Sequence, residues 1–519
     1  MIKALHAHGY YDANVTVRID EEENNVEIFV MIQPGKPYLI QEFTTEAFSE
    51  GAALKCQALE PESLGIKMGK PAITTAILDA EQKALSLLGE CGYPLSMLEN
   101  QEIIADYKHK TFAVHLKIDA GPLSKFGKTT VTGTRKVKNK LFENKMAWKV
   151  DEIYDTRLVE KTQKRLLDTG LFTSVIISHD SNLNDQKQLP MRIEASETKH
   201  RSVNVGASYQ TYFGPGVTVG WEHRNLSGLG RKFSLQGDFT KRTHTGTAVF
   251  FVPDFYTIDQ DYVLQGQALQ ESIFAYHQRA YNITNRIERR IDTKYRFAAG
   301  LKFERMIVSN SVQDGTSSLL EVPLYFRWSS ASNLLNPTHG ATLEYKLVPT
   351  TNFSHEDRFY AYNSLTYAFY VPVLEEDTFV IAQQIMVDSI LSKNLHAVPV
   401  PKRVLGGSDT ELRGYRYHTV SPIRKREHKP IGGRSGIFYT FETRFRVSKS
   451  IGLVPFFDMG SVYLTSFPKT HEKWYKSAGL GFRYFSFLGP LRFDIAFPLD
   501  RRKHIDSLYR VLVSIGQTF

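Results

Sequence analysis

The sequence predicts two architectures in series: α+β repeats over residues 1–198, then an all-β, antiparallel transmembrane barrel over residues 199–519. Three observations lead to this prediction. Helix-like runs that end at a glycine recur in the first part, short strands of alternating polarity replace them after residue 200, and no run of 18 apolar residues occurs in the chain. The last observation excludes a helical membrane protein, but not a barrel, whose strands alternate apolar and polar residues.

Composition narrows the class of protein. Of the 519 residues, 42% are hydrophobic and 12% are aromatic, which suits the aromatic girdles of a barrel. The net charge is +9, but the basic residues are scattered rather than gathered into a stripe, which argues against nucleic-acid binding. The sequence lacks P-loop, G-x-S-x-G, H-E-x-x-H and C-x-x-C motifs, and His6 and His8 are more typical of solvated side chains than of a metal site. We therefore expect no catalysis, no cofactor and no metal ion.

The first 198 residues contain a repeat. Three segments resemble one another, residues 5–19, 88–103 and 166–180. In each, a helix-like run ends at a glycine and the chain then passes an aromatic residue and enters a strand. These glycines are Gly9, Gly92 and Gly170, spaced 83 and 78 residues apart. The spacing is typical of a series of small domains rather than of a solenoid.

The second and third repeats, residues 37–121 and 122–198, each have the pattern of a strand, two helices and a two-stranded hairpin. This β-α-α-β-β unit resembles the polypeptide-transport-associated (POTRA) domain. The first copy, residues 1–36, holds only the end of its second helix and its last two strands, too little to be stable alone. We therefore expect that the start of this domain and a secretion signal are missing before Met1. Cys56 and Cys91 fall in one predicted domain, where they can form a disulfide or remain buried thiols.

From His200 onward the chain has the pattern of short alternating strands. In residues 436–447, for example, apolar residues alternate with Glu442 and other charged side chains, and in residues 490–497 Arg492 and Asp494 share the polar face. A soluble sandwich alternates as well, but the aromatic content, the number of strands and the ending favour a barrel. At about 20 residues for each strand and its connection, the residues from 200 to 519 give about 16 strands.

The stretch 403–422, RVLGGSDTELRGYRYHTVSP, is neither a helix nor a regular strand, because it is rich in glycine and turn residues. Within it, the tetrad Leu412, Arg413, Gly414, Tyr415 matches the [VI]RG[FY] motif of the Omp85 superfamily of outer-membrane insertases and translocases. In that family the motif lies at the tip of a loop folded back into the barrel. Residues 224–232 and 336–340 resemble two turns of the same barrels, and the terminal Phe519 resembles their C-terminal signal.

The resemblance implies a position and partners for Arg413. Five predicted strands follow the loop, which places it between strands 11 and 12, as in the family. There the loop arginine meets acidic residues at the positions of Glu442 and Asp458, and strand alternation turns both carboxylates toward the lumen. An arginine fork can bind a carboxylate through two hydrogen bonds. The alternative is that Arg413 is one of many lumen arginines.

An insertase has to open its barrel where the first and last strands meet, because only there can the wall part without breaking the chain. The predicted seam lies between residues 202–210 and 509–519. Its residues are Val203, Val205, Gly206, Tyr209, Val513, Ile515, Gly516 and Phe519. Gly206 has no side chain to pack, and Gly516 weakens strand pairing and permits an inward kink of the chain; the alternative is that both are ordinary small residues of the lumen.

Within the superfamily, the number of repeats and strings such as FFDMGSVY and GPLRFDIAFPL resemble most closely the TamA branch, the outer-membrane subunit of the translocation and assembly module. That resemblance implies a barrel in the lipid bilayer of the outer membrane, POTRA domains in the periplasm, a TamB-like partner anchored in the inner membrane, and unfolded outer-membrane proteins as substrates. The alternatives are a BamA-type general insertase, a two-partner-secretion transporter and a passive porin-like barrel. The POTRA domains either bind partners through an exposed sheet edge or act only as spacers.

Overall fold

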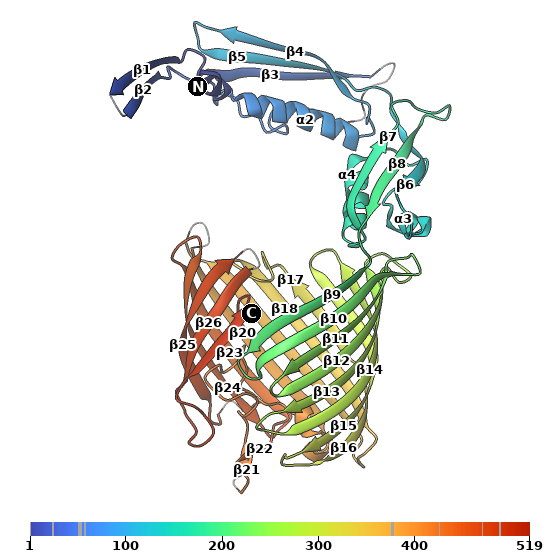
Figure 1. Cartoon of the computed structure of the whole chain (residues 1–519), viewed down its shortest axis with the longest axis vertical. Coiled ribbons are helices and arrows are strands. Elements are labelled where there is room, and N and C mark those ends of the chain that lie inside the picture. The colour runs from blue at the N-terminus through green and yellow to red at the C-terminus, as the bar shows by residue number, and fades with distance from the viewer. Residues whose placement is uncertain are drawn as a thin grey trace. The chain divides into compact units, whose positions relative to one another are not determined.

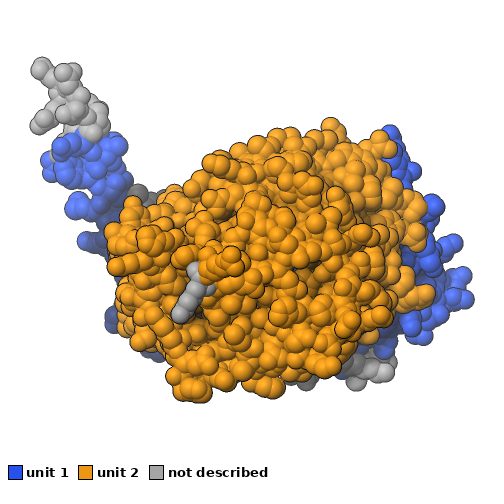
Figure 2. Space-filling view, turned by 90° about the horizontal axis from the view of Figure 1, so that it is seen from below, with its two compact units in different colours: residues 1–198 blue, residues 199–519 orange. Residues whose placement is uncertain are grey.

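The structure, a computed structural model, describes residues 2–22, 25–49, 54, 56, 59–374, 378–424, 426–469, 471–486 and 489–519. The chain forms two compact units, Met1–Thr198 and Lys199–Phe519 (Figure 2). The first unit combines helices with small sheets, and the second is a barrel of antiparallel strands (Figure 1). Within the described residues, no helix combines the length and the apolar character that crossing a membrane requires.

The first repeat consists of a short helix, α1 (Ile2–Ala7), and a hairpin of β1 (Asn14–Glu22) and β2 (Asn25–Gln33). Helix α1 buries none of its residues. The hairpin forms a two-stranded sheet of its own, in which Val17, Ile28 and Met31 are more than half exposed. An isolated two-stranded hairpin is only marginally stable in water.

The second repeat packs one helix, α2 (Thr74–Glu90), on a sheet of β3 (Leu39–Phe48), β4 (Met97–Asp106) and β5 (Thr111–Asp119). The strand order is β3-β5-β4, with β3 parallel and β4 antiparallel to β5. The buried residues of the helix recur at helical spacing and form one face, with Ile77, Ala80, Ala84 and Leu88 in the core. Cys56 and Cys91, whose pairing the sequence left open, form a disulfide with their Cα atoms 5.5 Å apart.

The earlier of the two helices predicted for this repeat is absent from residues 59–73, which the structure describes as turns and extended chain. Gly65 and Gly69 have φ angles of +88° and +74° there, and a run of such residues cannot continue a right-handed helix. Residues 50–53, 55, 57 and 58, on which part of that prediction falls, lie outside the described residues. The prediction of a helix over the described part is therefore wrong.

The third repeat carries both predicted helices, α3 (Asn139–Lys145) and α4 (Thr156–Leu167), with a sheet of β6 (Lys125–Thr132), β7 (Phe172–His179) and β8 (Gln188–Glu197). The sheet order is β6-β8-β7, with β6 parallel and β7 antiparallel to β8. The Asp155 carboxylate caps α4 by accepting a hydrogen bond from the Arg157 backbone N–H. Here the predicted β-α-α-β-β order is confirmed.

The barrel is built from antiparallel strands that follow one another around the ring in sequence order (Figure 1). They are β9 (Arg201–Gln210), β10 (Gly214–Leu226), β11 (Arg231–Thr240), β12 (Thr243–Val252), β13 (Gln260–Ser272), β14 (His277–Ile291), β15 (Tyr295–Ser309), β16 (Gly315–Glu321), β17 (Leu324–Ser329), β18 (Gly340–Asn352), β19 (Phe359–Pro372), β20 (Phe379–Ser392), β23 (Ser435–Arg446), β24 (Ile451–Tyr463), β25 (Tyr475–Ser486), β26 (Gly489–Pro498) and β27 (Arg510–Ile515). The pairing of β27 with β9 closes the ring.

One strand position of the ring is interrupted. β16 and β17 both pair with β15 and with β18, one after the other along the same gap. Pro323 lies between them, and a proline has no N–H to donate to a strand ladder. With β16 and β17 counted as one position, the described part of the barrel has 16 strands, which confirms the predicted number.

The last strand ends earlier than predicted. β27 stops at Ile515, although the sequence predicted a strand that continues to Phe519. The reason is Gly516, whose φ of +91° turns the chain out of the extended conformation. After the turn, the Gln517 N–H donates to the carbonyl of Leu335 (3.1 Å), in the connection between β17 and β18. The connection itself reaches across to this side of the barrel, since its Pro337 carbonyl accepts a hydrogen bond from Arg444 on β23, and residues 517–519 leave the wall to meet it.

Candidate functional site

A long connection, residues 393–434, joins β20 to β23, which are the eleventh and twelfth strand positions, as predicted. It contains the short helices η2 (Leu395–Ala397) and η3 (Val400–Lys402) and the two-residue strands β21 (Ile423–Arg424) and β22 (Lys429–Pro430). Backbone bridges pair Val404 with Gly433 and Gly406 with Val420. We call residues 398–406, 420–424 and 426–433 the stalk of this loop, and residues 407–419 its tip. The tip carries Arg413.

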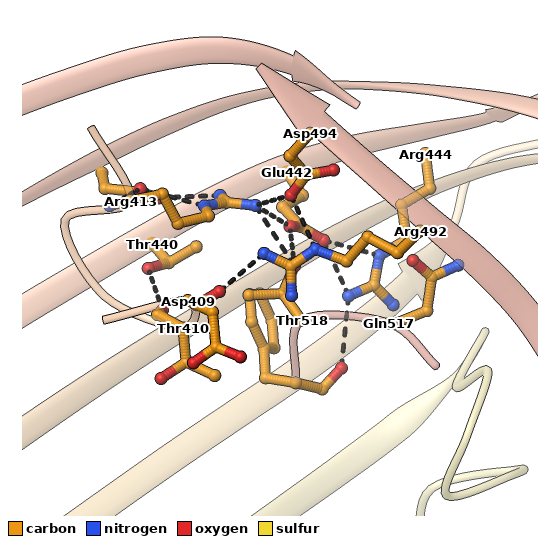
Figure 3. A network of polar contacts seen from close by, with 12 residues as sticks. Asp409, Thr410, Arg413, Thr440, Glu442, Arg444, Arg492, Asp494, Gln517 and Thr518 are labelled. Atoms are coloured by element: carbon orange, nitrogen blue, oxygen red, sulfur yellow. Dashed lines mark hydrogen bonds and ion pairs between the residues drawn. The ribbon is translucent and has the colours of Figure 1, made fainter. Parts of the chain in front are cut away.

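Arg413 is fully buried and is bound on several sides (Figure 3). Its Nε and Nη2 donate to the two oxygens of Asp458 at 3.0 and 2.7 Å, and its backbone N–H donates to the same carboxylate. Its Nη1 donates to Glu442 at 2.8 Å, to Asp494 at 3.1 Å and to the Thr518 hydroxyl at 3.2 Å. The structure thus brings the predicted residues Glu442 and Asp458 together around Arg413, and adds Asp494 and Thr518.

Three arginines of the wall extend this group into a network. Arg444 binds Glu442 at 2.8 Å, and Arg483 and Arg492 bind Asp494 at 2.5 and 2.7 Å. We call the whole set the arginine lock: Arg413, Arg444, Arg483, Arg492, Glu442, Asp458, Asp494 and Thr518. Its charged side chains are at most 7% exposed. Each of these charges therefore depends on its partners rather than on water.

The other tetrad residues are fixed by close packing. A Cβ on Gly414 would stand 2.7 Å from the backbone nitrogen of Pro498, so only glycine fits there. The Tyr415 side chain is fully buried, and its hydroxyl donates to the Lys476 carbonyl at 2.9 Å. Leu412 packs in an apolar cluster between the loop and the wall. Each of the four residues therefore makes its own contact with the barrel wall.

Burial and neighbouring charges shift the pKa values of the ionisable groups of the tip in different directions. Burial lowers the pKa of Arg413, but the carboxylates of Asp458 and Glu442 outweigh it and raise that pKa, so the guanidinium stays charged. Its central carbon also lies 3.4 Å from the centre of the Phe456 ring, a cation–π contact. Burial raises the pKa of Glu411 to about 8 and lowers the pKa of His418 to about 4, so both side chains are neutral near pH 7.

Sequence reasoning did not assign Asp494 and Thr518 to this site. Alternation already turned Asp494 inward, but nothing in the sequence joined its strand to a loop residue 81 positions away. Thr518 lies in the predicted seam segment 509–519, and the turn at Gly516 carries it to the lock instead. The lumen-facing position that strand alternation gives Asp494 was the one sequence signal that pointed to its place in this site.

The residues predicted for the seam fall into two groups. Val203, Val205 and Tyr209 lie on β9 with 71%, 73% and 62% of their surface exposed, and a Cβ on Gly206 would have no heavy atom within 4 Å. Val513 and Ile515 lie on β27, beside β9 in the ring. The Val513 N–H donates to the Thr211 hydroxyl at 3.1 Å, just beyond the end of β9.

Gly516 and Phe519 do not continue the seam strand. Because the chain turns at Gly516, the Phe519 ring lies inside the barrel, 6.1 Å from the ring of Tyr370 on β19. The Arg444 guanidinium lies 5.2 Å from the centre of the same ring and donates to the main-chain oxygen of Phe519. The predicted place of Phe519 in the seam is therefore wrong.

The chain resembles known proteins in sequence. Residues 225–519 match the Omp85 superfamily domain, and residues 124–195 match the surface antigen variable number repeat, the POTRA domain. The outer membrane protein assembly factor BamA of Nitratidesulfovibrio vulgaris is 22% identical over 542 residues, covering 99% of this chain and 66% of that protein. The protein of the same name from Buchnera aphidicola is 25% identical over 307 residues, covering 57% of this chain and 46% of that one. The chain thus spans less than two thirds of the length of these relatives.

A solved structure resembles the chain in fold. The crystal structure of BamA from Haemophilus ducreyi lacking POTRA domains 1–3 has a TM-score of 0.75 to this chain at 17% identity, covering 91% of this chain and 99% of that one. At that identity the likeness is one of fold alone. It extends over the repeats and the barrel, which is the fold class that the sequence predicts.

Proposed function

Because the chain belongs to the Omp85 superfamily, we propose that it is a non-enzymatic assembly or translocation factor of the outer membrane, with its POTRA domains in the periplasm. The observation that carries this proposal is the arginine lock. It holds the LRGY tip inside the barrel through buried charges, whereas a passive pore needs an open lumen. The relatives' own name, outer membrane protein assembly factor, supports the same function.

The seam between β27 and β9 is the site of action in this proposal. A closed barrel has no free strand edge, and an insertase has to expose one in order to template an incoming strand. β27 is six residues long, whereas β9, its partner across the seam, is ten residues long. A short last strand leaves fewer backbone hydrogen bonds to break when the wall parts. The seam then opens laterally, pairs with substrate strands and releases them into the bilayer.

The POTRA domains are the proposed contact with other proteins. β3 and β4 are the edge strands of one POTRA sheet, and β6 and β7 are the edge strands of the other. On β4, Ile103 and Ile104 are 47% and 50% exposed. An edge strand with exposed apolar side chains can pair with an extended segment of another chain. The substrates in this proposal are unfolded β-rich outer-membrane proteins, and in the TamA-like version autotransporter-like chains together with a TamB-like partner.

The test is assembly by the full chain folded into liposomes. An unfolded outer-membrane barrel protein is added, and its folding is followed by protease resistance and by its gel shift on heating. The proposal expects faster folding than in empty liposomes, and loss of the gain in Arg413→Ala. A large, steady single-channel conductance with no gain in folding would instead indicate a porin. Acceleration restricted to autotransporter substrates would favour the TamA-like version over a general, BamA-type insertase.

A further inference from the structure

The connection between β9 and β10, residues 211–213, lies at the end of the seam where β9 stops and β27 begins. We call these three residues the latch. The Thr211 hydroxyl accepts the hydrogen bond from the Val513 N–H at 3.1 Å. The guanidinium of Arg510, the first residue of β27, lies 4.8 Å from the centre of the Tyr212 ring, which is a cation–π contact. Two side chains of the latch therefore hold the last strand directly.

The latch also contacts the tip of the loop. The centre of the Tyr417 ring lies 4.6 Å from that of Tyr212 and 5.3 Å from that of Phe213. Tyr212 is 9% exposed, so its ring is surrounded by protein rather than by water. Among the described residues, neither the Tyr212 hydroxyl nor Nε of Arg510 has a hydrogen-bond partner. What holds Tyr212 between the tip and the last strand is therefore ring packing together with the cation–π contact.

On the other side of the seam, the tip is bound through charged groups. Arg502, in the connection between β26 and β27, donates to the carbonyl and the hydroxyl of Thr419 at 2.6 and 2.8 Å. The same guanidinium binds the buried carboxylate of Asp506 at 2.7 Å, and that carboxylate accepts a hydrogen bond from the Arg416 N–H at 3.3 Å. Hydrogen bonds to charged groups are about twice as strong as those between neutral groups. The tip thus spans the seam, and it is held more firmly on the side of the last strand than on the side of the latch.

The rest of the tip is fixed to the same side of the barrel. The lock binds Arg413 to β23, β24 and β26, and Arg492 on β26 donates to the Asp409 carbonyl at 2.6 Å. A further contact, that of Arg416 over the Phe274 ring at 4.0 Å, reaches the connection between β13 and β14 and not the first two strands. Because the contacts described between latch and tip are ring contacts, the latch separates from the tip more easily than the tip leaves the lock.

We propose that Tyr212 is a positioning residue that holds the seam closed, because its ring joins the first strand to β27 through Arg510 and to the loop through Tyr417. The tip stays in the lock and serves as the fixed surface against which the latch rests. When the wall parts, the latch leaves the tip and the last strand together. The inference rests on the proposed function, since it assigns the closed state of the proposed seam to one side chain.

The test is the distance between two spin labels placed across the seam of the full chain, folded into phosphatidylcholine nanodiscs. The labels are carried by Val217→Cys on β10 and Val511→Cys on β27, which are 49% and 47% exposed, in a background with Cys56→Ala and Cys91→Ala. Double electron–electron resonance then gives the population in which the two strands have moved apart.

Tyr212→Leu is expected to raise the separated population by about fivefold, because it removes both the ring pair and the cation–π contact. Tyr417→Leu should raise it as well, and the two substitutions together should have less than the sum of their separate effects, because both residues act through one contact. Arg510→Gln removes the cation from the other face of the ring and should raise the separated population too. It gives the same test if Tyr212→Leu does not fold.

Two controls separate this role from a loss of packing. Tyr212→Phe keeps the ring and removes a hydroxyl that has no hydrogen-bond partner among the described residues, so it should leave the distances unchanged. Tyr276→Leu removes a buried ring, 2% exposed, from the connection between β13 and β14, and should also leave them unchanged. Unchanged distances in Tyr212→Leu and Arg510→Gln, or an equal separation in either control, would overturn the proposal. The measurement needs no substrate, so a negative assembly assay would defeat the proposed function and leave this result standing.

Discussion

The wall formed by β23–β26 and the seam between β27 and β9 are held together by different means. Glu442, Asp458 and Asp494 on the wall are fully buried and bind arginines from the loop and from the wall itself. On the seam side, Val203 and Val205 point outward with about 70% of their surface exposed. There the backbone N–H of Val513, on β27, donates a hydrogen bond to the hydroxyl of Thr211, just beyond the end of β9. Among the described residues, the ion pairs with both side chains at most 7% exposed lie between the loop and the strands β23–β26 that hold it, or within those strands.

This difference shows how a barrel can be stable and still have one place to open. Buried ion pairs are costly to break from one side, so strands joined through them separate with difficulty. A strand pair held by backbone hydrogen bonds can separate and form the same bonds with another strand. In the proposed mechanism the wall would therefore part beside the lock rather than through it, because the lock joins the loop to β23, β24 and β26.

The largest expected effect comes from closing the seam covalently. Thr211→Cys and Val513→Cys, in the background without Cys56 and Cys91, place two thiols where the Val513 N–H already meets the Thr211 side chain. Oxidation should abolish substrate assembly, and a reductant should restore it. The matched control is Val205→Cys with Val219→Cys, a registered pair between β9 and β10 that lateral opening does not separate. Assembly that proceeds unimpaired with the seam crosslinked would refute lateral opening.

The next effect is on the lock. Arg413→Ala leaves Asp458 without its arginine, and breaking a buried pair from one side costs on the order of 3–5 kcal/mol. Arg413→Lys should not restore stability, because an ammonium cannot bind two carboxylate oxygens in the planar geometry of a guanidinium. The measurement is the temperature at which the folded form disappears on a gel. Arg446→Ala, at the exposed end of β23, is the control and should change it little.

Replacing threonine by valine, once at the lock and once at the seam, should have a smaller effect on stability. The Thr518 hydroxyl donates to Glu442 at 2.6 Å and accepts from Arg413, and a bond to a charged group contributes about 1.5–3 kcal/mol. Thr211→Val removes a bond to a backbone N–H, worth about 0.5–1.5 kcal/mol. Denaturant unfolding should therefore give Thr518→Val a lower free energy of unfolding than Thr211→Val. The reverse order would mean that the seam, not the lock, holds the end of the chain.

How much of this follows from the sequence differs between the two regions. Strand alternation placed Glu442, Asp458 and Asp494 on the lumen face, and the family tetrad identified Arg413, so most of the lock was within reach of local patterns. The missing information was which lumen residues meet across the interior, as Arg413 and Thr518 do over 105 residues of chain. Alternation also extended the last strand to Phe519, because a side-chain pattern with period two carries no information about the backbone angle at Gly516.

The smallest effect separates the two glycines of the seam, of which the sequence predicted an inward kink at Gly516 alone. Gly516 has a φ of +91°, and a Cβ there would meet its nearest atom, the Leu335 carbonyl oxygen, at an ordinary 3.7 Å. The cost of Gly516→Ala is therefore one of backbone conformation, about 1–2 kcal/mol. Gly206 lies in extended β9 with open space around it, so Gly206→Ala should be neutral or stabilise the barrel by up to about 1 kcal/mol. The free energies of unfolding of the two variants, measured with a denaturant, test this difference. If Gly516→Ala were as stable as Gly206→Ala, the inward turn of residues 516–519 would not be needed for stability, and the terminal strand could run on along the seam.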